Sequence, residues 1–168
     1  MNKDLENIIE SVCGKIFPRN IVAICNELGI TVQETGQFSN DISGMIFKED
    51  GKYFILVNKN HSIGRKSFTI AHELGHYFLH KDLLDENSQL VSYIKIRDTD
   101  CPALARGLSY NCLEMEANAF AAELLMPEKE FLSKCELANS IEEVAEHFGV
   151  SVQAATIRAN KVGGWFFL

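Results

Sequence analysis

The sequence lacks the features that would place it in a membrane, secreted or disulfide-rich class. No apolar run approaches the roughly 18 residues that cross a bilayer, and the first six residues lack the basic-then-apolar order of a secretion signal. The five cysteines are odd in number and scattered, without a C-x-x-C pair, which favours reduced thiols over disulfides or a cysteine-rich zinc cluster. We therefore expect a cytoplasmic protein with no membrane partner.

Positive charge is also scarce. The chain has 16 lysines and arginines against 23 acidic residues, a net charge of −7, so a broad electrostatic grip on nucleic-acid phosphates is disfavoured. Its 168 residues are 46% hydrophobic, which is enough for one core and too short for two full domains. We expect a single domain over residues 1–168 and no direct nucleic-acid binding. The sequence does not indicate an oligomeric state.

The spacing of apolar residues in the first half predicts helices followed by strands and another helix. A hairpin turn is expected at Asp50-Gly51, and Gly29 is expected to end the second helix. Helices are predicted over residues 4–16, 19–28 and 67–80, and strands over residues 30–32, 44–48 and 52–58.

The second half begins with a mixed stretch over residues 83–108, with one predicted strand at residues 90–96. Helices are then predicted over residues 111–126, 128–135 and 140–162, the last broken at Gly149 with Ser151 as a cap. The fold class expected is α+β: a small antiparallel sheet with a β-hairpin, packed on a helical bundle.

The most specific motif is HELGH at residues 72–76, an H-E-x-x-H pattern inside a predicted helix. Positions four apart on a helix share one face, so His72 and His76 can bind one metal ion. Glu73 lies beside them, where a carboxylate can take a proton from water activated by the metal, as zinc hydrolases require. The alternative is a chance match, because three fixed positions in five recur in proteins that bind no metal.

A third ligand has to come from elsewhere, because the third histidine of the longer metzincin motif does not follow. The helix over residues 111–126 offers Glu114 and Glu116, whose side chains lie about 200° apart around its axis. Glu114 falls in the apolar stripe, where a lone carboxylate needs a cation, and Glu116 falls on the polar flank. We predict Zn²⁺ bound by His72, His76 and Glu114. Glu116 is the alternative ligand, and an ordinary ion-pair role for Glu114 stays open.

Two further residues are expected to support the ligands. Asn118, one turn after Glu114, is placed to accept a hydrogen bond from a ligand histidine. His80 lies about 12 Å along the axis from His72, too far to share its ion, so a supporting or structural role is expected. Ala117 is small enough to let the two helices approach closely.

Two longer blocks surround these candidates, HELGHYFLH at residues 72–80 and EMEANAFAAELLMP at residues 114–127. Together, and in this order, they resemble the ImmA/IrrE family of bacterial metallo-endopeptidases. The pair of blocks is far more specific than H-E-x-x-H alone, and the similarity extends over most of the chain.

The resemblance implies a zinc peptidase of gluzincin type, with Glu73 as general base and Glu114 as the ligand glutamate. It also implies a protein substrate, a DNA-binding helix-turn-helix repressor whose cleavage switches on genes of a mobile element or a stress response. The alternative is a non-catalytic regulator that keeps the metal site and works by binding.

The sequence does not identify the group that would stabilise the oxyanion. Four residues are eligible by chemistry alone: His61, Tyr93, Arg106 and Tyr110. The substrate backbone could pair with an exposed strand edge, a common way of holding an extended peptide.

Residues 139–162 resemble a helix-turn-helix, with Gly149 at the turn. Between residues 142 and 161 the basic residues are Arg158 and Lys161, against three glutamates, so affinity for phosphates would be poor. We expect these helices to pack against the catalytic unit or contact a protein substrate rather than read DNA.

Overall fold

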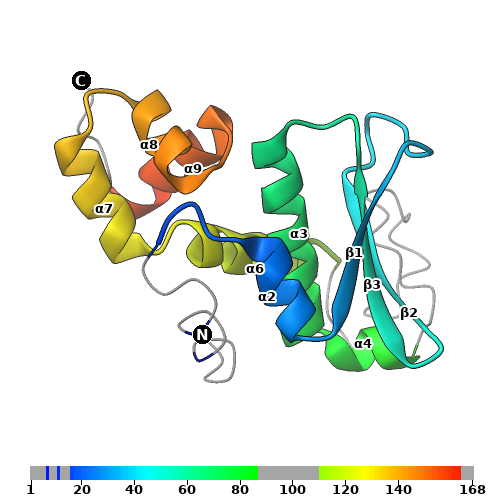
Figure 1. Ribbon diagram of the computed structural model, residues 1–168. Helices are drawn as coiled ribbons and strands as arrows, with labels where there is room; N and C mark the ends of the chain where they lie inside the picture. Colours follow the sequence, from blue (N-terminus) through cyan, green and yellow to red (C-terminus); the bar gives the residue numbers. More distant parts are fainter. Residues whose placement is uncertain (1–6, 8–10, 12–15, 87–109, 164–168) are drawn as a thin grey trace.

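The computed structural model describes residues 7, 11, 16–86 and 110–163, and the predicted α+β class is confirmed (Figure 1). The helix predicted over residues 4–16 lies outside the described residues except at residues 7, 11 and 16, and the strand predicted over residues 90–96 lies wholly outside them. No helix in the described part of the chain is long and apolar enough to cross a membrane. The elements are α2 (Ile21–Glu27), β1 (Ile30–Thr35), β2 (Gly44–Glu49), β3 (Lys52–Asn58), α3 (Ile63–Leu79), α4 (Lys81–Glu86), α6 (Tyr110–Leu125), α7 (Glu128–Leu137), α8 (Ile141–Phe148) and α9 (Val152–Val162).

The sheet is mixed, so the expected antiparallel sheet is wrong in one of its two pairings. Its strand order is β1-β3-β2, with β2 antiparallel to β3 and β1 parallel to β3. After β1 the chain crosses the end of the sheet over residues 36–43 and returns as β2, and β3 then enters between the two earlier strands. Apolar alternation in a strand indicates its buried face but not its neighbour, so the sequence could not predict this order.

Asn58 explains why the crossing connection is held at the end of β3. Its side chain is fully buried, and its Nδ2 donates to the carbonyl oxygens of Ser39 and Ile42, 2.9 Å away in each case. The backbone N–H of Asn58 also donates to the carbonyl oxygen of Ser43. These bonds fix the loop against the strand, where unpaired carbonyls would otherwise be costly to bury.

The predicted hairpin is confirmed. Asp50 and Gly51 both have positive φ, 49° and 77°, which is the backbone of the two-residue turn that suits the twist of antiparallel strands. Gly29 likewise ends α2 with φ of 71°. The strand β1 runs on to Thr35 although it was predicted to end at Val32, because its exposed half is polar and gives no apolar signal.

Two helices differ from the prediction. The helix α3 begins at Ile63 rather than Ser67, since Ser62 caps it by accepting a hydrogen bond from the amide of Arg65. The short helix α4 was not predicted at all. It buries Leu83 and Leu84, and its six residues, fewer than two turns, are too few to display helical periodicity.

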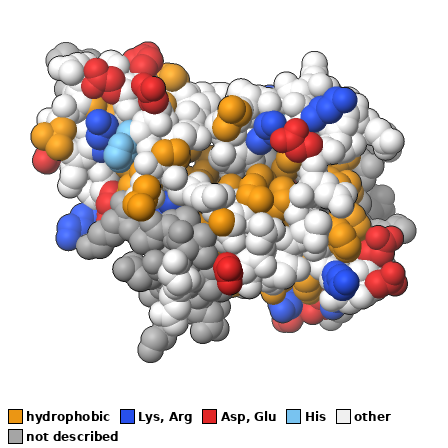
Figure 2. Space-filling model, in the orientation of Figure 1, with side chains coloured by type: hydrophobic (Ala, Val, Ile, Leu, Met, Phe, Trp, Pro, Cys, Tyr) orange, Lys and Arg blue, Asp and Glu red, His pale blue; other side chains and the backbone are white. Residues whose placement is uncertain are grey.

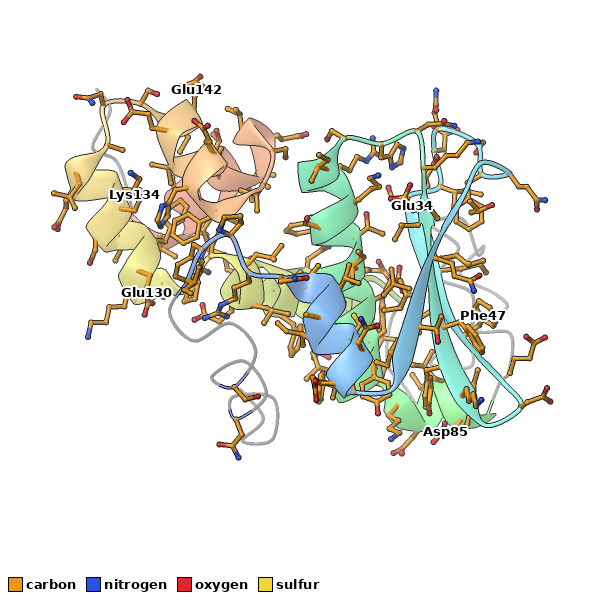
Figure 3. The ribbon with its side chains drawn as sticks, viewed as in Figure 1. Glu34, Phe47, Asp85, Glu130, Lys134 and Glu142 are labelled. Carbon is orange, nitrogen blue, oxygen red and sulfur yellow. The ribbon has the colours of Figure 1, made fainter. Side chains whose placement is uncertain are left out.

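The molecule is arranged around the packed pair α3 and α6 (Figure 1). One face of the sheet lies against α3, and β2 carries Phe47 on the opposite face, as Figure 3 shows. The helices α7, α8 and α9 gather at the far side of α6 from the sheet. One continuous core joins both sides and includes the fully buried side chains of Ile24, Ile46, Ile55, Leu74, Leu124, Phe131 and Phe148.

The C-terminal helices pack on the rest of the chain, as predicted. A Cβ on Gly64 in α3 would lie 2.8 Å from the backbone of Val150, so the start of α3 touches the turn between α8 and α9 directly. That turn has the expected form, with Gly149 left-handed and Ser151 capping α9. Arg158 is 6% exposed and donates from Nε to the carbonyl oxygen of Met126, so this basic group is used inside the fold.

Candidate metal centre

The two motif histidines lie one turn apart on the face of α3 that meets α6. His76 is buried and His72 is partly buried, and their Nε2 atoms face each other at 3.0 Å. The helical spacing alone sets this arrangement, because residues i and i+4 stack on one side of a helix.

Glu114 reaches the histidines from α6. Its two carboxylate oxygens lie 3.2 Å from Nε2 of His72 and 3.1 Å from Nε2 of His76. Such proximity requires the helices to approach closely, and Gly75 permits it: a Cβ there would lie 2.9 Å from Cα of Ala117. The small residues at this contact therefore bring the three side chains together.

The three side chains fit a divalent metal ion. Their ligand atoms all lie within 4.8 Å of one another. A tetrahedral zinc ion with bonds of about 2.0–2.1 Å holds its ligand atoms about 3.3 Å apart, close to the spacings observed here. In addition, the buried Oε1 of Glu114 accepts no well-aligned hydrogen bond from the described residues, although it lies 3.1 Å from Nε2 of His76. A cation would satisfy this oxygen and both facing nitrogens at once.

Groups behind the histidines contact their other ring nitrogens. Nδ1 of His72 is 3.0 Å from Oδ1 of Asn118. Nδ1 of His76 is 3.0 Å from Nδ1 of His80, whose Nε2 is in turn 3.0 Å from Oε2 of Glu116. Thus Asn118 and His80 both touch the ligand candidates, whereas Glu116 touches only His80 among these three histidines.

The electrostatics of the cluster favour a charged carboxylate. Burial alone would raise the pKa of Glu114, but hydrogen bonds and charge interactions with His72 and His76 hold it well below its ordinary value. Burial likewise opposes protonation of His72, yet Glu114 and the nearby Glu73 charge raise its pKa overall. Burial lowers the pKa of His80, with a further contribution from His76, so His80 is neutral near pH 7.

Glu73 is 2% exposed and lines a cavity of about 340 Å³ together with His72 and Glu114. The cavity gives a reacting group access to the metal cluster from solvent. Its other walls come from the end of the β1–β2 connection, the first half of α3 and one residue of α6: Ser43, Gly44, Arg65, Phe68, Thr69 and Asn118.

Two residues that line the cavity, Arg65 and Gly44, were not among the site residues predicted from the sequence. Arg65 lies seven residues before His72, which places it within about 20° of His72 around the helix axis. A helical wheel that began at Ile63 would therefore have placed Arg65 on the face of the motif histidines. Its guanidinium donates to Oγ of Ser43 at 3.0 Å. Gly44 lets β2 pass close to α3, because a Cβ there would lie 2.4 Å from Cγ2 of Thr69. No local pattern in the sequence marks that contact.

The candidates for oxyanion stabilisation gain no support from the described residues. His61 does not line the cavity beside the metal cluster, and its Nε2 lies 3.2 Å from the carbonyl oxygen of Asn40. Tyr93 and Arg106 lie outside the described residues, as does the side chain of Tyr110.

Comparison with known proteins now identifies the family. The sequence model of Peptidase_M78, described as the IrrE N-terminal-like domain, matches residues 25–160. The chain belongs to this family. It is 25% identical to Metallopeptidase ImmA of Bacillus subtilis (strain 168) over 169 aligned residues. The alignment covers 98% of this chain and 89% of that protein. The resemblance to ImmA/IrrE metallopeptidases is confirmed.

A solved structure supports the fold of this Peptidase_M78 member. The Mycobacterium tuberculosis transcriptional regulator superposes on it with a TM-score of 0.62 at 20% sequence identity, covering 94% of this chain and 45% of that chain. This chain therefore spans less than half of that regulator, and the likeness bears on the fold alone.

Proposed function

We propose that this chain is a zinc-dependent endopeptidase that hydrolyses a peptide bond in a specific protein. The observation that carries the proposal is the meeting of His72, His76 and Glu114 at one point, beside the buried Glu73, in a cavity open to solvent. Membership of a metallopeptidase family supports the same conclusion. We propose further that residues 1–168 act as a single domain.

In this proposal His72 and His76 hold zinc through Nε2, and Glu114 holds it through its carboxylate. Each ligand histidine then carries its proton on Nδ1, where His72 donates to Asn118 and His76 donates to His80. His80 can accept at Nδ1 because it is neutral, and it donates from Nε2 to Glu116. One set of tautomers satisfies every contact, which orients both ligand rings.

Glu73 is the general base. Bound zinc would supply Lewis-acid activation of a water molecule and of the scissile carbonyl. The Glu73 carboxylate takes the proton from the attacking water and later delivers it to the amine nitrogen that leaves.

The start of β2 is the proposed support for the substrate backbone. Gly44 and Ser43 line the cavity, and within the described part of the chain β2 pairs on one side only, with β3. An extended peptide added to that edge would pass in front of the metal cluster.

The substrate proposed is a helix-turn-helix transcriptional repressor, cleaved in the cytoplasm, so that genes of a mobile element or a stress response are switched on. This step rests on the family resemblance. The acidic exterior of α8, with Glu142, Glu143 and Glu146 exposed, favours a protein substrate over direct contact with nucleic acid. Figure 2 shows acidic side chains gathered at this end of the molecule.

The proposal is tested by incubating the zinc-loaded protein with a repressor encoded beside its gene. We expect cleavage that a chelator abolishes. Glu73→Gln should retain about one zinc per chain and lose at least about 100-fold in cleavage rate, because the ligands remain and the base does not. Glu128→Gln, on the exposed surface of α7, is the matched control. If Glu73→Gln keeps its full biological activity although it cleaves nothing, a regulator that works by binding is favoured instead.

A further inference from the structure

A second, larger cavity adjoins the metal centre. It has a volume of about 690 Å³ and lies between the first half of α3, α6 and α9. It shares Arg65, Phe68 and Asn118 with the cavity at the metal cluster, so the two cavities are adjacent. We call the larger part the α9 groove. A volume of this size is typical of sites that enclose a sizeable ligand.

The walls of the α9 groove present apolar side chains that the fold leaves uncovered. Met115 on α6 is 70% exposed and Ile157 on α9 is 60% exposed, and both line the groove with Phe68. Single exposed apolar residues are common, but here two large ones face a shared depression from different helices. Such a concentration is typical of a binding surface.

The charged side chains among the described residues that line the α9 groove are all basic. They are Arg65, Arg158 and Lys161, and no aspartate or glutamate is among the lining residues. Arg158 is neutralised by an ion pair with Glu123, whereas Lys161 is exposed and Arg65 contacts the neutral hydroxyl of Ser43. In a chain of net charge −7, a basic groove beside the reacting centre favours an acidic ligand.

We propose that the α9 groove binds the substrate polypeptide on one side of the scissile bond. An apolar side chain of the substrate packs against Ile157, Met115 and Phe68, and an acidic side chain lies near Lys161. The inference rests on the proposed endopeptidase function and adds a preference to it. The helix α9, which would read DNA in a helix-turn-helix protein, instead selects the protein that is cut.

The test selects peptides from a random synthetic library on immobilised, zinc-loaded Glu73→Gln protein. Bound peptides should be enriched in sequences that place an acidic residue close to an apolar one. Adding Lys161→Glu should reduce the acidic enrichment about fivefold or more, and adding Ile157→Ser should reduce the apolar enrichment similarly. Lys129→Glu on α7 and Val152→Ser on α9 are exposed, lie outside the groove and should change neither.

A second arm separates this inference from the proposed function. The selected peptides are incubated with zinc-loaded wild-type protein, and cleavage at a constant distance from the acidic residue supports the inference. Cleavage with a selection profile that the groove variants leave unchanged would overturn the inference and leave the peptidase standing. Selective binding without cleavage of any peptide or of the repressor would overturn the peptidase proposal. Self-association of the wild-type protein that Ile157→Ser abolishes would assign the groove to a second copy and overturn the inference.

Discussion

Two glutamates on α6 occupy different surroundings although they are only two residues apart. The side chain of Glu114 is 20% exposed and touches both motif histidines, whereas that of Glu116 is 61% exposed and contacts His80. A helix turns about 200° between these positions, so they cannot both reach the same point. The rotation between the two positions therefore decides which glutamate can reach the histidines.

We predict that Glu114→Ala lowers zinc affinity by more than about 100-fold, while Glu116→Ala lowers it by no more than about tenfold. The first variant removes a ligand, and the second removes only a partner of His80. Zinc content after dialysis against a chelator of graded strength measures both. Equal zinc retention by the two variants would refute the assignment of Glu114.

Asp85, labelled in Figure 3, accepts a hydrogen bond from Nζ of Lys48 at 2.8 Å and another from the hydroxyl of Tyr53. Both contacts lower the pKa of Asp85, and the contact with Lys48 has the larger effect. A carboxyl with a lowered pKa in the folded state stabilises the protein above its unfolded pKa of about 3.9 and loses this effect as pH falls through the folded value.

Asp85→Asn should therefore be less stable than wild type near pH 7, and the difference should shrink below about pH 4. Urea unfolding at both pH values measures it, with Asp82→Asn on the same helix as the control. A difference that stays constant with pH would mean that the charge of Asp85 contributes nothing.

At the level of helices and strands, the contact between α3 and α6 brings the candidate metal ligands together. Gly75 lies within the H-E-x-x-H motif, and Ala117 lies on α6 between the candidate ligand Glu114 and Asn118. These two small residues lie against each other, so α3 and α6 approach closely and the histidines and the glutamate can converge. Gly64, eleven residues earlier on α3, makes an equally close contact with the backbone at Val150.

We predict that Gly75→Ala destabilises the fold by about 1–3 kcal/mol, because the added methyl group forces α3 and α6 apart. Zinc affinity should fall about tenfold or more, since the ligands separate. Gly64→Ala is the matched control: it crowds Val150 and should lower stability while leaving zinc affinity unchanged. Thermal unfolding and zinc titration of both variants decide the matter, and a parallel loss of zinc affinity in both would contradict the prediction.

For the whole molecule, a metal ion would join its two sides. The sheet packs on α3, and the chain continues from α6 into α7, α8 and α9, so ligands on α3 and α6 belong to both sides (Figure 1). A ligand that binds only the folded state stabilises it by mass action. The metal centre is thus expected to support the fold as well as the chemistry.

Free zinc at about 100 times its dissociation constant should raise the unfolding temperature by about 5–10 °C relative to the chelated protein. Glu73→Gln should keep this shift and Glu114→Ala should lose it, because only the latter removes a ligand. Circular dichroism melts with zinc and with a chelator measure the effect. An identical melting temperature in both conditions would exclude a metal held between the two helices.

Much of the secondary structure and the chemistry of the donor side chains could be predicted from the sequence alone. Local interactions decide these features: the i, i+4 spacing of His72 and His76, the Asp50-Gly51 turn, and the Gly149 and Ser151 signals between α8 and α9. Glu114 could also be predicted as a ligand from the sequence. It falls in an apolar stripe, and a buried carboxylate without a partner is destabilising.

The sequence could not predict which distant segments pack against one another. The parallel pairing of β1 with β3, the cavity walls at Gly44 and Arg65, and the α9 groove all join residues far apart in the chain. Such contacts depend on how helices and strands pack as whole surfaces, and many sequences with the same apolar periodicity could pack otherwise. Periodicity reveals which side of an element is buried, whereas packing selects the partner that buries it.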